Sequence, residues 1–155
     1  MSFNVRRVVT GHDENGKARV LIDGPTENVI SRREGQNSTV IWATDQRDPD
    51  LGELNDISGP IRQTVMPDGT VFRISRLEPG VAPRMHRTES LDYAVVISGE
   101  IDMELDDGEV VRLRAGDALV QRGTVHNWIN NGTEPCVIAF VLIAASLPDG
   151  LEGAG

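Results

Sequence analysis

Histidine is the side chain best suited to acid–base chemistry or metal binding near neutral pH, and this chain of 155 residues contains three of them. His86 lies six residues after Gly80, and His126 lies three residues after Gly123. A single histidine on a strand is more often a hydrogen-bonded structural group than a ligand. Two histidines that each lie a short distance after a glycine, in separate segments of the chain, indicate a functional site more strongly than a single histidine does. His12 lies in a polar turn and is expected to be exposed.

Other kinds of chemistry are excluded by the motifs that the chain lacks. It contains no Gly-x-Ser-x-Gly nucleophile elbow, no phosphate-binding loop and no dinucleotide fingerprint. Cys136 follows Pro135 and has no histidine at motif distance, so we expect an inert structural thiol. Because this is the only cysteine, no intramolecular disulfide can form, and a cytoplasmic location is expected.

The charge of the chain limits its partners. Fifteen lysine and arginine residues against 24 aspartate and glutamate residues give a net charge of -9, without a basic stripe. We therefore expect neither nucleic acid nor an anionic membrane as a partner. The longest apolar run, residues 136–145, is about half of the ~20 residues that a membrane helix needs. The expected partner is a small-molecule ligand.

The elements that must position the histidines are strands. In the second half of the chain, short apolar runs are separated by turn residues, and Ile101, Met103 and Leu105 alternate with acidic residues. No amphipathic helix of ten or more residues is evident, so we predict an antiparallel β-barrel. The expected organisation is N-terminal strands and a long connection packing on the barrel (1–69), the barrel core (70–146) and a flexible C-terminal tail (147–155).

The two histidine frames resemble the two motifs of the cupin superfamily. Residues 80–99, GVAPRMHRTESLDYAVVISG, are similar to the first motif, and residues 116–130, GDALVQRGTVHNWIN, are similar to the second. The resemblance covers about half of the chain, roughly residues 70–143, with the motifs in the expected order. It implies an all-β fold, namely a double-stranded β-helix or jelly-roll barrel, here with extra N-terminal strands.

This sequence departs from the cupin motifs at the metal ligands. His86 and His126 match ligand histidines, whereas Thr88 replaces a further histidine and Asp92 replaces the glutamate. The resemblance therefore implies one divalent transition metal (Fe, Mn, Ni or Zn) held by His86, Asp92 and His126. Two alternatives stay open. Glu89 is another candidate carboxylate, and the centre is empty if the shorter aspartate does not reach the metal.

Strand alternation predicts further residues around this site, because side chains two positions apart share a face. The predicted substrate pocket consists of Thr88, Ala94, Trp128, Arg73 and Phe140. Arg73 and Arg76 point to opposite faces of one strand, so at most one of them lies inside the barrel. An arginine inside the barrel would be an anion anchor, since a buried cation needs a partner.

Two functions are compatible with these motifs. The first is a small metal-dependent cupin enzyme that acts on a small oxygen-containing organic molecule, with dioxygenase, decarboxylase, isomerase and lyase reactions undecided. The second is a non-catalytic, metal-free cupin that serves as a small-molecule-binding or dimeric structural module, which the missing histidine favours. The resemblance also implies a homodimer, and unpaired N-terminal edge strands favour the same assembly.

Overall fold

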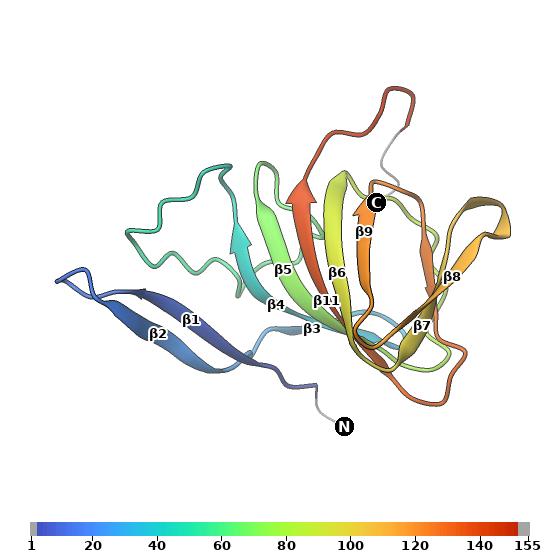
Figure 1. The fold of residues 1–155 in the computed structure, drawn as a ribbon, viewed down its shortest axis with the longest axis horizontal. Helices are drawn as coiled ribbons and strands as arrows, with labels where there is room; N and C mark the ends of the chain where they lie inside the picture. The colour runs from blue at the N-terminus through green and yellow to red at the C-terminus, as the bar shows by residue number, and fades with distance from the viewer. Residues whose placement is uncertain (1–2, 152–155) are drawn as a thin grey trace.

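The computed structural model describes residues 3–151, and in this range the chain consists almost entirely of antiparallel β-strands (Figure 1). The strands are β1 (Arg6–His12), β2 (Ala18–Pro25), β3 (Val29–Arg33), β4 (Gln36–Thr44), β5 (Thr70–Leu77), β6 (Ser90–Ser98), β7 (Glu100–Glu104), β8 (Val110–Arg114), β9 (Ala118–Arg122), β10 (Asn127–Ile129) and β11 (Cys136–Ala144). A single 3-10 turn, η1 (Asp106–Gly108), is the one helical element in the described range. No helix of residues 3–151 is long and apolar enough to cross a membrane. The prediction of an all-β fold is confirmed.

Two sheets form the walls of a barrel. The larger sheet has the strand order β3-β4-β5-β11-β6-β9, and the smaller sheet has the order β10-β7-β8. Their inner faces share one apolar core, in which Val71, Val96, Ile101 and Leu142 are each 2 % exposed or less. Strand β6 pairs with β9, and β7 pairs with β10. The β6–β9 pairing therefore brings the two histidine motifs side by side, and β10 of the second motif pairs with the strand that follows the first motif.

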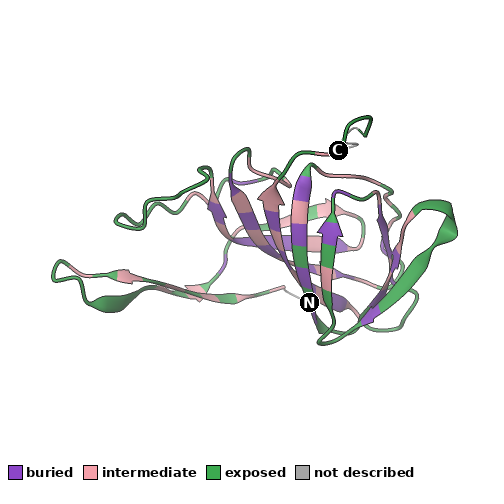
Figure 2. Cartoon of the chain, turned by 45° about the horizontal axis from the view of Figure 1, so that its top comes forward, coloured by how far each residue is buried: buried purple, intermediate pink, exposed green. Residues whose placement is uncertain are grey.

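Burial alternates from one residue to the next along the central strands, which separates interior from exterior side chains (Figure 2). On β5 this alternation places Arg73 inside the barrel. Arg76 lies on the other face, where its Nε donates to Glu78 Oε1 at 2.6 Å. On β11, Phe140 is the register partner of Arg73 on one side and of Ala94 on the other.

The barrel begins earlier in the chain than the sequence predicted. Strand β4 is hydrogen-bonded to β5, with Val40 opposite Arg73, and β3 is hydrogen-bonded to β4. The larger sheet therefore extends to strands before residue 70, and the sequence does not show this for β4, because β4 mixes buried polar residues such as Ser38 with apolar ones and lacks a clean apolar alternation. Of the predicted tail (147–155), residues 147–151 form no strand, and 152–155 lie outside the described residues.

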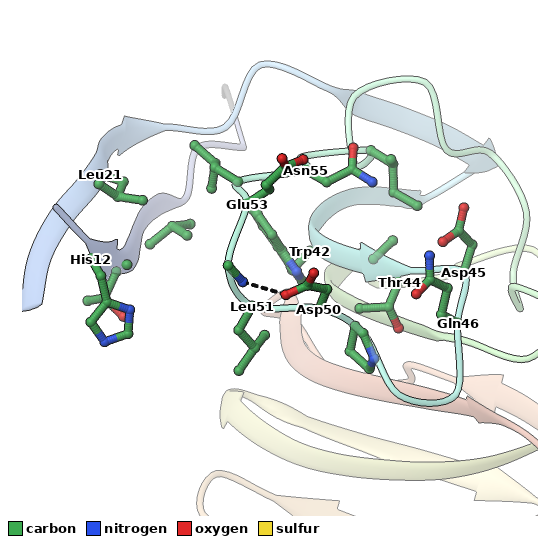
Figure 3. A pocket seen from close by; sticks show the side chains of 18 of the residues that line it. His12, Leu21, Trp42, Thr44, Asp45, Gln46, Asp50, Leu51, Glu53 and Asn55 are labelled. Atoms are coloured by element: carbon green, nitrogen blue, oxygen red, sulfur yellow. Dashed lines mark hydrogen bonds between the residues drawn. The ribbon is translucent and has the colours of Figure 1, made fainter. Parts of the chain in front are cut away.

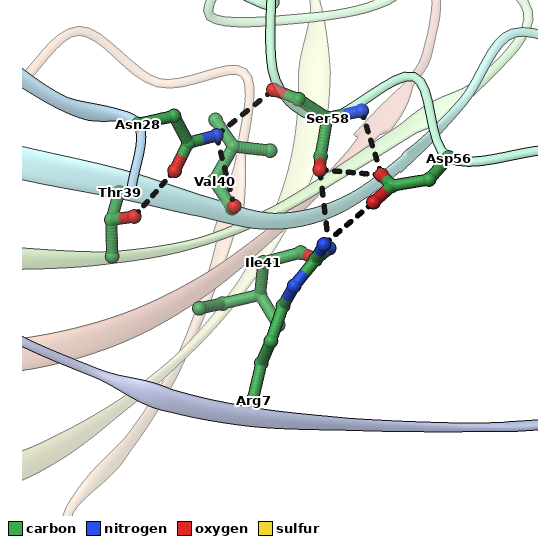
Figure 4. A network of polar contacts seen from close by, with 7 residues as sticks. All are labelled: Arg7, Asn28, Thr39, Val40, Ile41, Asp56 and Ser58. Carbon is green, nitrogen blue, oxygen red and sulfur yellow. Dashed lines mark hydrogen bonds and ion pairs between the residues drawn. The ribbon is translucent and has the colours of Figure 1, made fainter. Parts of the chain in front are cut away.

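The first two strands form a hairpin that extends away from the barrel (Figure 1). Arg7 attaches this hairpin to the barrel (Figure 4). Its Nη1 donates to the Ile41 carbonyl at 3.0 Å and to Ser58 Oγ at 3.2 Å, and its Nη2 lies 2.6 Å from Asp56 Oδ2. Beyond this attachment the hairpin is mostly exposed or half-buried, including Val20, which is 59 % exposed. The hairpin thus offers apolar surface that its own barrel does not cover.

Candidate functional site

The two motif histidines are held together by their own backbones. The His86 N–H donates to the His126 carbonyl at 3.0 Å, and the His126 N–H donates to the His86 carbonyl at 2.9 Å. This isolated antiparallel bridge sets the centroids of the two imidazole rings 4.3 Å apart, with an angle of 54° between the ring planes. The two motifs therefore meet at a pair of side chains, although they are far apart in the sequence.

Each imidazole is oriented through its Nδ1 atom. Nδ1 of His86 lies 3.0 Å from the Arg84 carbonyl. Nδ1 of His126 lies 2.9 Å from the Thr124 carbonyl, and the Gln121 amide approaches the same nitrogen at 2.5 Å. Because a carbonyl oxygen only accepts hydrogen bonds, Nδ1 carries the proton and Nε2 keeps a free lone pair. For His126 this requires the Gln121 amide to be turned, so that its Oε1, which otherwise has no partner, accepts from Nδ1 in place of the amide nitrogen.

Burial keeps both imidazoles neutral. It lowers the pKa of His86 below its ordinary value, and it lowers the pKa of His126 to about 4. His126 is also more deeply buried, at 4 % exposed, and its ring meets Trp128 edge-on with centroids 5.8 Å apart. At pH 7 the pair therefore presents two uncharged Nε2 atoms that can accept a hydrogen bond or bind a metal ion.

Asp92 lies at the end of a short series of hydroxyl groups. Its Oδ1 accepts a hydrogen bond from Ser90 Oγ at 2.5 Å, and Ser90 Oγ lies 2.8 Å from Thr88 Oγ1. Since Ser90 gives its single proton to Asp92, Thr88 donates to Ser90 and keeps its oxygen lone pairs for another donor. Burial raises the pKa of Asp92, while the Ser90 hydrogen bond and the charge of Arg73 oppose this shift.

These groups line a small cavity inside the barrel with a volume of about 30 Å³. Trp128 and Phe140 form its apolar wall, and their ring centroids lie 5.8 Å apart. Within the described part of the chain, four arginines line the same cavity, namely Arg32, Arg33, Arg73 and Arg84. They come from β3, from β5 and from the loop before β6. The cavity therefore combines two neutral imidazoles with a concentration of positive charge.

Arg73 is deeply buried for a cation, at 8 % exposed. Its Nε and Nη1 atoms have no hydrogen-bond partner, and its guanidinium carbon lies 5.6 Å from the centroid of the Phe140 ring. Burial, aided by the charge of Arg32 and opposed by that of Asp92, lowers the pKa of Arg73 to about 9. Of the two arginines considered from the sequence, Arg73 is thus the one inside the barrel.

Most of the residues predicted for the site line this cavity. They are His86, Asp92, His126, Thr88, Trp128, Arg73 and Phe140. Ala94 differs, because it is 5 % exposed and packs in the apolar core without lining the cavity. It shares the interior face of β6 with Asp92, but its short side chain does not extend as far as that of its register partner Phe140.

The donor groups of this cavity do not fit a three-ligand metal centre. In residues 3–151, no group of three or more His, Cys, Asp or Glu side chains is arranged to hold a metal ion. The Nε2 atoms of His86 and His126 are suitable donors, but Asp92 is bound to Ser90 and does not complete the set. The surrounding guanidinium groups also oppose a further positive charge.

A larger hollow of about 720 Å³ lies elsewhere, beside the β1–β2 hairpin and the connection that follows β4 (Figure 3). His12 lines it from the exposed end of β1. Asp50 also lines it, and its carboxylate already accepts a hydrogen bond from the Gly52 N–H at 2.8 Å. Neither His86 nor His126 reaches this hollow, so the smaller cavity holds the groups suited to chemistry.

Sequence reasoning does not identify Arg32 and Arg33 as site residues. They lie in the N-terminal third of the chain, outside both histidine motifs. They reach the cavity because β3 pairs with β4, and β4 pairs with β5, which carries Arg73. The sequence contains only a weak indication that they belong to the site, namely two adjacent arginines at the end of a strand-like run in an acidic chain.

Comparisons with known sequences agree with the fold and the motifs. Residues 73–143 match the family model described as "Cupin domain". The chain is 40 % identical over 147 residues to "Cupin-domain-containing oxidoreductase fogC" of Aspergillus ruber, covering 90 % of this chain and 72 % of that protein. It is also 40 % identical over 134 residues to "Phomopsin biosynthesis cluster protein D" of Diaporthe leptostromiformis, covering 80 % of this chain and 69 % of that protein.

Solved structures show the same fold at low sequence identity. One is the polyketide cyclase RemF from Streptomyces resistomycificus, with a TM-score of 0.55 and 16 % identity over 79 % of this chain and 77 % of that one. Another is a conserved protein with a double-stranded β-helix domain from Klebsiella pneumoniae, with a TM-score of 0.53 and 21 % identity over 83 % of this chain and 91 % of that one. With the strand order, the paired motifs and these relatives in agreement, the chain belongs to the cupin family.

Proposed function

We propose that this chain is a cupin enzyme that acts on a small oxygen-containing organic molecule inside the barrel. The observation that carries the proposal is the pair of neutral imidazoles, His86 and His126, whose free Nε2 atoms share one interior cavity. Groups of this kind bind a substrate hydroxyl or accept its proton during the reaction. Thr88 adds an oxygen acceptor beside them, and Trp128 and Phe140 supply an apolar wall.

The relatives favour a redox reaction. Four of them carry the printed description "cupin-domain-containing oxidoreductase": fogC at 40 % identity, virC of Hypocrea virens at 34 %, and srdD and srdB of Neurospora crassa at 33 % and 27 %. We therefore propose oxidoreductase chemistry as the first reaction class to test. A non-catalytic binding module is the second candidate, and the observation that favours it is Thr88 at the position of a motif histidine.

The test is the consumption of a compound from a small-molecule extract, followed by mass spectrometry with and without added Fe(II), Mn(II), Ni(II) or Zn(II). We expect the wild-type protein to convert at least one compound, and His126→Ala to lower the rate at least about hundredfold, because a positioned acid–base group contributes about that much. His12→Ala is the matched control, since His12 is exposed and lies outside the cavity.

The fold of His126→Ala is checked by circular dichroism, and His126→Gln is a second variant that keeps more of the side-chain volume. Equal rates in wild type and both His126 variants would contradict the proposal. No conversion under any metal condition, with retained small-molecule binding, would establish the binding module instead.

A divalent metal held by His86, Asp92 and His126 stays a prediction. Metal analysis of protein purified without a histidine tag or chelator tests the prediction directly. One metal per chain, lost in His126→Ala and kept in His12→Ala, would establish the centre despite the two-donor arrangement described above.

We also propose that the chain forms a homodimer. The outer face of β6 and β9 exposes apolar side chains, including Tyr93 at 48 %, Val95 at 46 % and Val120 at 60 %, and the β1–β2 hairpin exposes Val20. Burying such surface against a second copy is favourable. We expect light scattering to give twice the chain mass of 16.9 kDa, and Val95→Glu to lower it towards one chain. A wild-type mass of one chain would contradict the dimer.

A further inference from the structure

We propose that the barrel cavity recognises a carboxylate, so that the substrate or ligand is a small organic acid held by Arg73 with Arg32 and Arg33. This inference rests on the proposed function and narrows it to a substrate class. The inference is drawn from Arg73, Arg32 and Arg33, which line the cavity with the histidines and lie outside both cupin motifs. The two arginines on β3 also lie outside the segment that matches the family model.

The first step concerns the burial and the hydrogen bonding of the Arg73 side chain. Its guanidinium is more than nine-tenths removed from solvent, yet Nε and Nη1 donate to nothing. A buried cation without hydrogen-bond acceptors is costly, and proteins retain one mainly where a partner completes it. The nearby Phe140 ring interacts with the positive charge but accepts no conventional hydrogen bond from these atoms. Arg73 lines the cavity, so two buried donors beside it lack a protein acceptor, which a ligand could supply.

The second step is that Arg73 does not stand alone. Arg32 and Arg33 line the same cavity, and in each of them Nε and Nη2 are buried without a hydrogen-bond partner. Arg32 is held in place through its other terminal nitrogen, because Nη1 donates to the Arg62 carbonyl at 3.2 Å. Guanidinium groups that are anchored at one nitrogen and open at two others are suited to bind an anion with more than one oxygen.

The third step is the balance of charge. Asp92 is the one carboxylate among the described residues that line the cavity, whereas four arginines line it. Its Oδ1 already accepts from Ser90, so it does not satisfy the open nitrogen atoms of Arg73. The cavity is therefore positive within a chain whose net charge is -9. An anionic ligand would restore local neutrality.

The fourth step is size, which selects among anions. A cavity of about 30 Å³ has room for about two water-sized groups, since each needs roughly 10–15 Å³ measured in this way. This matches the two oxygens of a carboxylate better than the four of a phosphate. Because His86 and His126 line the same cavity, an acid held by its carboxylate presents its neighbouring atoms to the imidazoles.

The test uses formate and acetate as probes, which suit the small cavity, and their neutral amides, formamide and acetamide, as matched controls. Binding is followed by calorimetry and by the Nε–H signals of the arginine side chains in ¹⁵N-labelled full-length protein. We expect both acids to shift the Arg73 Nε–H signal to saturation and both amides to leave it unchanged. Arg73→Met should weaken acid binding at least about tenfold, since charge-assisted bidentate contacts are strong. Arg76→Met is the control on the outer face.

Each outcome decides the proposal. Equal responses to acids and amides, or equal acid affinity in Arg73→Met and Arg76→Met, would overturn it. Tighter binding of inorganic phosphate than of acetate would overturn the carboxylate assignment in favour of a phosphorylated ligand. If Arg73→Met does not fold, Arg32→Met supplies the same comparison. Acid binding that persists in His126→Ala, together with absent turnover in wild type, would refute the enzyme and leave carboxylate recognition standing.

Discussion

Replacing Arg73 with methionine is expected to raise the free energy of unfolding, by about 1–3 kcal/mol, although it removes a residue from the centre of the site. The guanidinium is buried with two open nitrogen atoms, and apolar replacement of buried charge is often stabilising by about that amount. Methionine is unbranched and flexible, so it can occupy much of the same space. Urea denaturation followed by tryptophan fluorescence measures the change.

The comparison for this prediction is Arg76→Met on the same strand. Arg76 pairs with Glu78 at 2.6 Å on the outer face, where the side chains are 15 % and 37 % exposed. Its replacement should lower the free energy of unfolding by about 1 kcal/mol or less. The opposite result is that Arg73→Met lowers the free energy of unfolding more than Arg76→Met does. In that case the Arg73 guanidinium stabilises the barrel, which contradicts a role in ligand binding alone.

Replacing Gly99 with alanine is expected to be among the most destabilising changes in the barrel, with a loss of about 2–4 kcal/mol. Gly99 has a φ of 75°, which costs other residues about 1–2 kcal/mol. An added Cβ would also lie 2.4 Å from the Pro135 carbonyl oxygen and 3.0 Å from the Cys136 Cα. These are backbone atoms at the start of β11, so they cannot move aside as a flexible side chain would.

Gly80→Ala separates the two causes. Gly80 has nearly the same φ, 74°, but an added Cβ there would meet nothing within 4 Å. It should therefore show the conformational cost alone, about 1–2 kcal/mol, and the excess loss in Gly99→Ala measures the clash. Equal losses in the two variants, determined by the same urea titration, would show that β11 yields to the new methyl group.

The barrel could be predicted from the sequence because its central strands follow simple rules. Alternation in the second half of the chain and the two histidine frames were enough to predict an all-β cupin fold, which the strand order and the relatives confirm. The start of the barrel could not be predicted in the same way. Strand β4 buries Ser38 and Thr39, and these polar residues hide its interior position, because Ser38 bonds to Ser75 and Thr39 to Asn28 inside the fold.

The site could be predicted only in part. The resemblance to the two cupin motifs implied that His86 and His126 belong to one centre, and the backbone bridge between them agrees with this. Alternation on a strand separates two faces without saying which is interior, so the sequence alone does not assign Arg73 to the interior face. Arg32 and Arg33 were missed for a different reason: their position depends on long-range strand pairing, which a local pattern does not report.

The position of β3 at the edge of the large sheet has a consequence for how such proteins diversify. Arg32 and Arg33 belong to a strand with one sheet neighbour, whereas His86 and His126 are bound into the centre of the barrel by their bridge. In the proposed acid-binding site, substitutions on this edge strand would therefore change which acid is preferred without repacking the core. Arg73 on the central strand β5 would still hold the carboxylate, so the preference could evolve at β3 while the centre of the site is retained.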